Sequence, residues 1–197
     1  MYSLPLSLVI FLYLRFNFIS KHMSFLIIFF LGLFTFVVIL AIIGWLSPKE
    51  IHVESKRHIS AEPDRLFIEL GDFENFVTWN PWSYKDPNIK NEFEGEKMSY
   101  GSIYRWKGNR HVGTGSIEIT HIEVNEKIEM ELRFGPGRPA QATFHLEPDQ
   151  NGTTVTWSLD SNMGNNPFSR VVGRMMKKYI TKDFEFGLKR LADKLNA

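Results

Sequence analysis

The sequence predicts an α+β fold: an apolar helix that crosses a membrane, then one domain in which an antiparallel sheet packs on a long C-terminal helix. Three observations lead to this prediction. A run of 23 uncharged residues, Ser24 to Leu46, lies near the N-terminus. Between residues 89 and 160, apolar and polar residues alternate, which is typical of strands with one wet face. After Pro167, apolar residues recur at spacings of three and four, which is typical of an amphipathic helix.

The uncharged run has the length of a transmembrane helix. At 1.5 Å per residue, a helix over Ser24 to Leu46 is about 34 Å long, enough to cross a hydrocarbon core of ~30 Å. Trp45 falls where aromatic side chains meet the membrane interface. The alternatives are a buried core helix and a cleaved signal peptide, whose apolar stretch is usually only ~7–15 residues. We therefore expect a single-pass membrane protein anchored through Ser24 to Leu46.

Residues 1–23 form an uncertain N-terminal extension. The apolar stretch from Leu4 to Leu14 has only 11 residues, which is too short to span a bilayer unaided. Met23 opens directly onto the uncharged run, so we hypothesise that Met23 is the true start. Basic residues lie on both sides of the run, and they leave the orientation in the membrane open.

Residues 47–197 are expected to form a single domain. This part of the chain has 151 residues with no internal repeat or linker, enough for one hydrophobic core. It holds 22 acidic and 21 basic residues, a formal charge of −1, which argues against nucleic acid as a partner. The chain has no cysteine, so it has neither a disulfide framework nor a thiolate metal site.

The domain opens with a strand over residues 51–59 and a helical region. Ser60 is a candidate N-cap, and Pro63 falls in the first helical turn, where its missing N–H costs little. Gly71 indicates a break between two short helices. The helical region is expected to end at residues 79–82, because the residue before a proline disfavours helix.

Six further strands follow, separated by turn residues. The pair Asn151-Gly152 is a strong hairpin signal, and strands joined so tightly should form an antiparallel meander. On the strand that ends at Phe134, Ile128 and Met130 share one face, whereas Lys127 and Glu129 share the other. The expected strands cover residues 89–94, 102–107, 111–121, 127–134, 140–147 and 153–160.

The chain is expected to end in a long helix. Asn166 is its N-cap and Pro167 its first residue, and its apolar stripe continues to Leu195. This stripe should pack on the apolar face of the sheet. Basic residues occupy much of the remaining circumference. They are candidates for contact with anionic lipid headgroups near the anchor, although a solvated surface is the simpler interpretation.

Several segments of the domain are similar to one known family. They include Trp79-Asn80-Pro81-Trp82 and Gly113-Thr114-Gly115, together with residues 59–67, 152–157 and 183–191. On these segments the chain, from about Glu50 to Leu195, resembles the START-like superfamily, specifically the bacterial polyketide cyclase/dehydrase and lipid-transport group (SRPBCC family). The resemblance implies a helix-grip (START/Bet v 1-like) fold and a hydrophobic small molecule or lipid bound between the sheet and the C-terminal helix. It implies no particular reaction.

The candidate ligand-binding residues are large apolar side chains of the sheet and helices. Aromatic rings offer broad apolar surfaces with a few polar tips that orient a ligand. The alternative for each residue is that it fills the core. The candidates are Trp79, Trp82, Tyr104, Trp106, Met130, Phe134, Phe144, Trp157, Met176 and Tyr179.

No catalytic motif is recognisable, so catalytic residues stay unassigned. The chain has no P-loop, H-E-x-x-H or G-x-S-x-G sequence, and the glycines of Gly113-x-Gly115 are better explained by a bent strand or a close neighbour. The histidines are not spaced for a metal site, and we expect no cofactor. Five polar strand residues would supply an acid only if they pointed inward: Arg105, His111, Glu118, Arg133 and His145. Arg133 and His145 should point outward.

Three functions remain open, all with the domain beside a membrane. The first is a carrier or sensor that binds a hydrophobic small molecule or lipid. The second is a cyclase or dehydratase that uses an inward His, Arg or Tyr as an acid. The third is an interaction domain whose own side chains fill the cavity. We expect location in a bacterial inner membrane. The ligand, the side of the membrane and the oligomeric state are not determined by the sequence.

Overall fold

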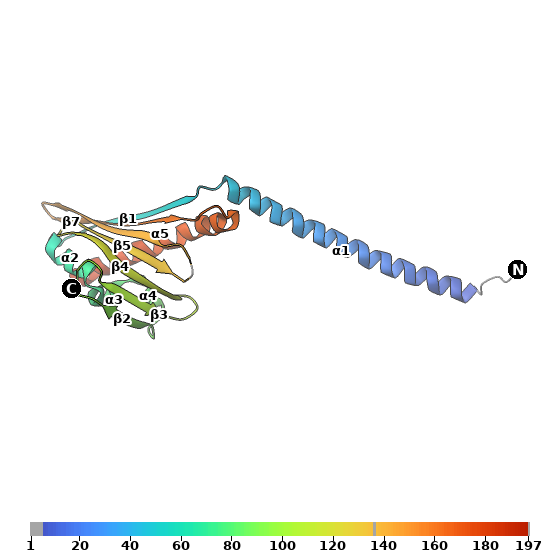
Figure 1. Ribbon diagram of the computed structural model, residues 1–197, viewed down its shortest axis with the longest axis horizontal. Helices are drawn as coiled ribbons and strands as arrows, with labels where there is room; N and C mark the ends of the chain where they lie inside the picture. Colours follow the sequence, from blue (N-terminus) through green and yellow to red (C-terminus); the bar gives the residue numbers. More distant parts are fainter. Residues whose placement is uncertain (1–5, 136, 197) are drawn as a thin grey trace.

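The fold was analysed in a computed structural model that describes residues 6–135 and 137–196. Helix α1, Leu6–Leu46, is a continuous helix of 41 residues that projects away from the rest of the chain (Figure 1). Within it, Lys21–Leu46 is long and apolar enough to cross a membrane, and an 18-residue apolar window of this stretch is not buried. Residues 1–5, where the uncertain extension begins, lie outside the described residues. The boundary between extension and span stays a prediction.

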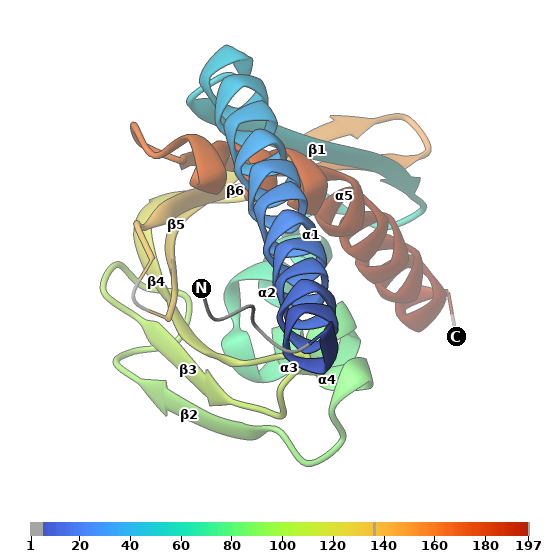
Figure 2. The same cartoon turned by 90° about the vertical axis from the view of Figure 1, so that its right-hand side faces the viewer.

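The remainder of the described chain is a curved sheet with helices on its concave side (Figure 2). The sheet has the order β1-β7-β6-β5-β4-β3-β2, and every neighbouring pair is antiparallel. This confirms the α+β class and the helix-grip architecture. The strands are β1 (Glu50–Ile59), β2 (Lys90–Glu94), β3 (Ile103–Lys107), β4 (Thr114–Glu123), β5 (Lys127–Phe134), β6 (Ala140–Asp149) and β7 (Gly152–Asn162). The helices are α2 (Pro63–Gly71), α3 (Phe73–Trp79), α4 (Pro81–Lys85) and α5 (Pro167–Leu195).

The predicted N-cap Ser60 was wrong: α2 begins at Pro63, and the residue at its N-cap is Glu62, whose side chain makes no capping hydrogen bond. Two predicted boundaries were also wrong, and local hydrogen bonds explain both. The helical region does not end at residues 79–82, because Asn80 caps a third helix, α4. The Asn80 side chain accepts hydrogen bonds from the backbone N–H groups of Trp82 and Ser83, both at 2.9 Å, and Pro81 occupies the first helical position. Strand β4 begins at Thr114 rather than at residue 111, because residues 109–113 form a turn that Asn109 closes.

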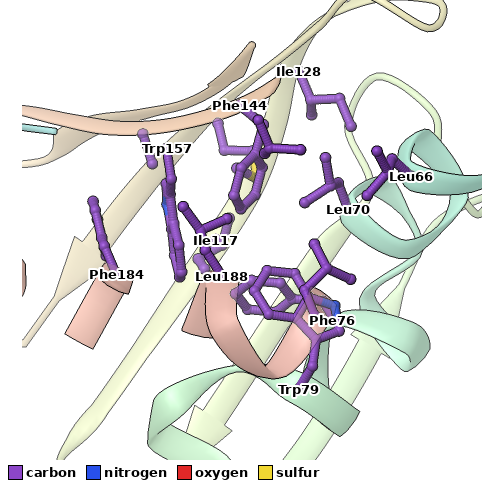
Figure 3. Close-up of a cluster of buried hydrophobic side chains, with 14 of the residues drawn as sticks. Leu66, Leu70, Phe76, Trp79, Ile117, Ile128, Phe144, Trp157, Phe184 and Leu188 are labelled. Carbon is purple, nitrogen blue, oxygen red and sulfur yellow. The ribbon is translucent and has the colours of Figure 1, made fainter. Parts of the chain in front are cut away.

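The core lies between the concave face of the sheet and the helices (Figure 3). Trp157 on β7 pairs with Phe144 on β6, and Phe144 pairs in turn with Ile128 on β5. Helix α3 adds Phe76 and Trp79, whose rings meet edge to face with centroids 5.0 Å apart. The alternation that the sequence predicts for these strands therefore places the apolar residues on the concave face.

Candidate functional site

The second half of α5 fills the space that it shares with the sheet. The Phe184 ring stacks on the Trp157 ring with centroids 3.9 Å apart and planes 8° from parallel. One helical turn later stands Gly187, where a Cβ would lie 3.0 Å from the Trp157 ring and 3.1 Å from Pro81. Helix and sheet are thus in direct contact from Phe184 onward, because buried residues such as Leu188 and Leu191 continue the same face.

The ten predicted ligand-binding residues fall into three groups. Trp79, Trp82, Phe144 and Trp157 form one cluster of contacting rings. Tyr104 and Trp106 are also buried, as is Met130, and they belong to the same core. The structure does not bring the remaining three into this core, because Phe134, Met176 and Tyr179 are exposed.

One stretch in the first half of α5 has no such packing. All six residues from Arg174 to Tyr179 are exposed. Lys177 is four residues after buried Gly173 and seven before buried Phe184, so it lies on the helix face that packs against the sheet elsewhere. The exposure of Lys177 means that this stretch of α5 is uncovered even on its inner side.

The concave face of the sheet is open at the same place. One row across β1, β7, β6 and β5 consists of Ile51, Ser161, Ala140 and Leu132, and each of them is half-buried. The next row, which contains Val53, Leu159, Ala142 and Met130, is fully buried. A Cβ on Gly173 would lie 2.2 Å from the Ile51 side chain. The half-buried row therefore begins where α5 meets β1, and two of its members are small.

Trp106 has a polar atom that the fold leaves without a partner. Its Nε1 is buried and has no hydrogen-bond acceptor among the described residues. The indole covers Gly115, where a Cβ would lie 2.3 Å from the ring, so this glycine allows a close neighbour, as the sequence indicated. The centroids of the Trp106 and Phe134 rings lie 5.9 Å apart. Phe134 is 53% exposed, so an exposed ring lies next to a buried, unpaired donor.

Tyr104, beside Trp106, is in the opposite situation. Its hydroxyl donates to Oδ1 of Asn91 at 2.9 Å. Burial raises the pKa of Tyr104 above its ordinary value, so the phenol stays protonated. Tyr104 is therefore a paired core residue, whereas the Trp106 N–H is still available.

The five polar candidates do not face the core. Arg105 and Glu118 alternate with inward residues of β3 and β4, and His111 lies exposed in the turn before β4. Arg105 pairs with Glu94 at 3.1 Å on the outer face, and its hydrogen bond lowers the pKa of Glu94. Arg133 pairs with Glu131, and His145 lies 3.7 Å from Glu147, also on that face. Among the described residues no cluster of His, Asp and Glu suits a metal ion.

Two hollows of the described surface lie away from the ten predicted residues. One, of about 340 Å³, is at the start of β1 and the end of β7. Its lining combines Ile51, Ala140 and Ser161 of the half-buried row with the outward-facing Glu131, Gln141 and Asp160. This hollow therefore reaches the half-buried row but is not the predicted apolar cavity. The other, of about 420 Å³, is lined by polar residues around Asp86 and Asn109. There the Asp86 carboxylate accepts a 2.6 Å hydrogen bond from the backbone N–H of Asn109, which fastens two loops together.

Arg170 is the important residue that sequence reasoning missed. It is only 7% exposed, and its Nε donates to the carbonyl of Gly164 at 2.9 Å. Its Nη1 donates to the carbonyl of Trp45 at 3.3 Å, the penultimate residue of α1. A cation at this end of a helix satisfies free carbonyls and complements the helix dipole. One sequence signal exists: Arg170 lies on the helix face that also carries Gly173 and Phe184.

The end of α1 and the start of α5 are in close contact. A Cβ on Gly44 would lie 2.1 Å from the carbonyl oxygen of Pro167, so only glycine allows the two backbones to approach this closely. Together with Arg170, this contact joins the apolar helix directly to the domain.

Comparison with known proteins agrees with this geometry. A family model for polyketide cyclase / dehydrase and lipid transport matches residues 50–196. No curated protein matches the sequence significantly.

Among solved structures, a protein from Rhodobacter sphaeroides is 19% identical with a TM-score of 0.56, over 74% of this chain and 91% of the other. Aha1 from Colwellia psychrerythraea, solved as a dimer, is 17% identical with a TM-score of 0.53, over 73% and 94%. DynU16, from the dynemicin biosynthetic locus, is 19% identical with a TM-score of 0.54, and the match covers 74% of this chain but 47% of DynU16. At these identities the structures establish the fold, and with the family match they show that the chain belongs to the polyketide cyclase/dehydrase and lipid transport family.

Proposed function

We propose that this protein is a membrane-anchored binding or carrier protein for a hydrophobic small molecule or lipid. The ligand lies between the concave face of the sheet and the uncovered stretch of α5 around Lys177. The observation that carries this proposal is the coincidence of two open surfaces: the inner side of α5 at exposed Lys177 and the half-buried row that contains Ala140 and Leu132. Such a concave, mainly apolar site is typical of small-molecule binding.

The unpaired Trp106 N–H suggests one feature of the ligand. A buried donor without an acceptor costs about 1–3 kcal/mol, which a ligand oxygen at hydrogen-bond distance would recover. An ester or carbonyl group on an otherwise apolar molecule fits this requirement. Phe134, exposed on one side and packed on Trp106 on the other, has to move for the ligand to reach the indole.

The anchor supports a ligand that partitions into membranes. Helix α1 ends against α5, so the uncovered stretch of α5 lies close to the point where the chain leaves the bilayer. Anchoring raises the local concentration of the site at the membrane surface. An enzymatic role has less support, since none of the five polar candidates faces the concave side.

The proposal is tested by native mass spectrometry of the full chain purified in detergent, with lipid extract added. Ala140→Phe places a ring in the half-buried row, whereas Gln141→Phe places the same ring next to it on the outer face. We expect a stoichiometric apolar molecule on the wild type and on Gln141→Phe, and its loss from Ala140→Phe while circular dichroism stays unchanged. A wild-type protein that carries no molecule and takes none from the extract refutes the proposal.

A further inference from the structure

We propose that the end of the domain next to α1 is a docking surface for anionic lipid headgroups of the bilayer that α1 enters. The inference rests on the membrane anchoring proposed above and adds a second contact with the membrane. Its occupant is the bilayer surface itself, and three independent observations support it: the placement of charges, the exposed stripe of α5 and the joint at Arg170.

The loops at the two ends of the sheet differ in charge. Strand pairing places residues 47–49, 86–89, 108–113, 135, 137–139 and 163–166 at the α1 end. These connections contain Lys49, Arg110 and Arg138, and their one acidic residue, Asp86, is buried. The connections at the far end are residues 60–62, 95–102, 124–126 and 150–151. They contain three glutamates, Glu62, Glu96 and Glu126, and one lysine, Lys97.

The strands themselves do not share this asymmetry. Their outward charges are mixed, because acids such as Glu131 pair with neighbouring bases such as Arg133. The basic character of the α1 end therefore comes from its loops, which are the parts of the sheet that a membrane beside α1 meets first.

The first turns of α5 carry an apolar stripe that nothing in the described structure covers. Phe168, Val172, Met175 and Tyr179 are separated by four, three and four residues, so they share one side of the helix. All four are exposed, Met175 at 63%. Because Phe184 packs on the sheet from the opposite side of α5, the stripe faces away from the core.

Basic residues accompany this stripe. Arg174 and Lys178 are exposed and form no ion pair within residues 6–135 and 137–196. An exposed apolar stripe with unpaired lysine and arginine beside it is the pattern of helices that lie in the interfacial zone of anionic membranes.

The joint at Arg170 fixes the position of this surface. Its hydrogen bond to Trp45 and the contact of Gly44 with Pro167 hold the start of α5 against the last turn of α1. Trp45 and Leu46 are at least 80% exposed, which suits side chains at a membrane interface. A bilayer entered by α1 therefore brings its headgroups to the first turns of α5 and to the basic loops.

The test uses the full chain in lipid nanodiscs. Because the protein has no cysteine, Met175→Cys can carry a single environment-sensitive fluorophore. Val124→Cys, also exposed, is the matched control at the far end of the sheet. The discs contain either phosphatidylcholine alone or phosphatidylcholine with phosphatidylglycerol.

We expect phosphatidylglycerol to shift the emission at position 175 to the blue, and we expect high salt to reverse this shift, because salt screens exposed charges. The control position should not respond. Arg174→Gln with Lys178→Gln should reduce the shift at least twofold, whereas Lys97→Gln with Lys127→Gln at the far end should leave it unchanged.

The outcomes separate the two proposals. A protein that does not stay with the discs in size-exclusion chromatography refutes anchoring, and docking with it. Retention without a phosphatidylglycerol-dependent shift at position 175, or with an equal shift at position 124, refutes docking alone.

Discussion

Replacing Phe184 by alanine tests whether the second half of α5 fills the space against the sheet. Phe184 is 2% exposed and stacked on Trp157 at 3.9 Å. Truncating a buried phenylalanine costs about 3–5 kcal/mol, and a ring pair adds about 0.5–1.5 kcal/mol to the burial of its area. We therefore expect Phe184→Ala to lower the free energy of unfolding by about 4 kcal/mol.

Phe186→Ala is the matched control. Phe186 lies on the same helix, is 41% exposed, and its ring contacts Tyr84 and Arg190. The two substitutions change helix propensity equally, so their difference reports burial. We expect Phe186→Ala to cost about 1 kcal/mol, which leaves a difference of about 3 kcal/mol between the variants.

The assay is urea unfolding of the full chain in mild detergent, followed by tryptophan fluorescence, with a separate baseline for each variant. The midpoint should fall much further for Phe184→Ala, with an unchanged denaturant slope, if only stability has changed. Equal decreases in the free energy of unfolding for the two variants would mean that Phe184 is not packed on Trp157. The second half of α5 and the sheet would then border a cavity.

Two further predictions concern the N-cap of α4 and the loss of stability at low pH. Asn80→Ala removes the acceptor for two N–H groups of α4 and should lower the free energy of unfolding by about 1–2 kcal/mol. Asn80→Asp keeps the acceptor and should cost less. Equal decreases in melting temperature for the two variants would contradict the capping role. The pKa of Asp149 is lowered from 3.8 by the Asn151 N–H and then by His58. A depressed folded-state pKa gives stability that is present above the unfolded value and is lost as the pH falls through the folded value. The melting temperature should therefore fall less steeply with decreasing pH for Asp149→Asn than for the wild type. The same pH dependence in both proteins would exclude the effect.

Periodicity was sufficient to predict the sheet and the long helices. The alternation in β5 and the Asn151-Gly152 turn define strands whose partners are sequence neighbours, so local chemistry fixes most of the topology. Helix α4 was missed because the Asn80 cap converts an apparent helix end into a helix start. The same local pattern, read without its side-chain hydrogen bonds, supports either interpretation.

The candidate site was harder to predict because burial depends on contacts between distant residues. Phe134, Tyr179 and Trp157 are all aromatic residues in regular elements, yet only Trp157 is buried in the core. Arg170 binds the carbonyl of a residue 125 positions earlier in the chain. No pattern along the sequence joins these two segments.

The route of the chain places both proposed sites at one end of the molecule. Only three residues separate α1 from β1, and β7 returns to the same end before α5 begins. The half-buried row at Ala140 and the exposed stripe at Met175 are therefore both close to the end of α1. The row lies on the concave face of the sheet, whereas the stripe lies on the side of α5 that faces away from the core. A lipid that leaves the bilayer at this point has a short path to the sheet, and docking would shorten it further. The two functions nevertheless separate experimentally, because Ala140→Phe should abolish the bound molecule and leave the fluorescence shift at position 175 intact.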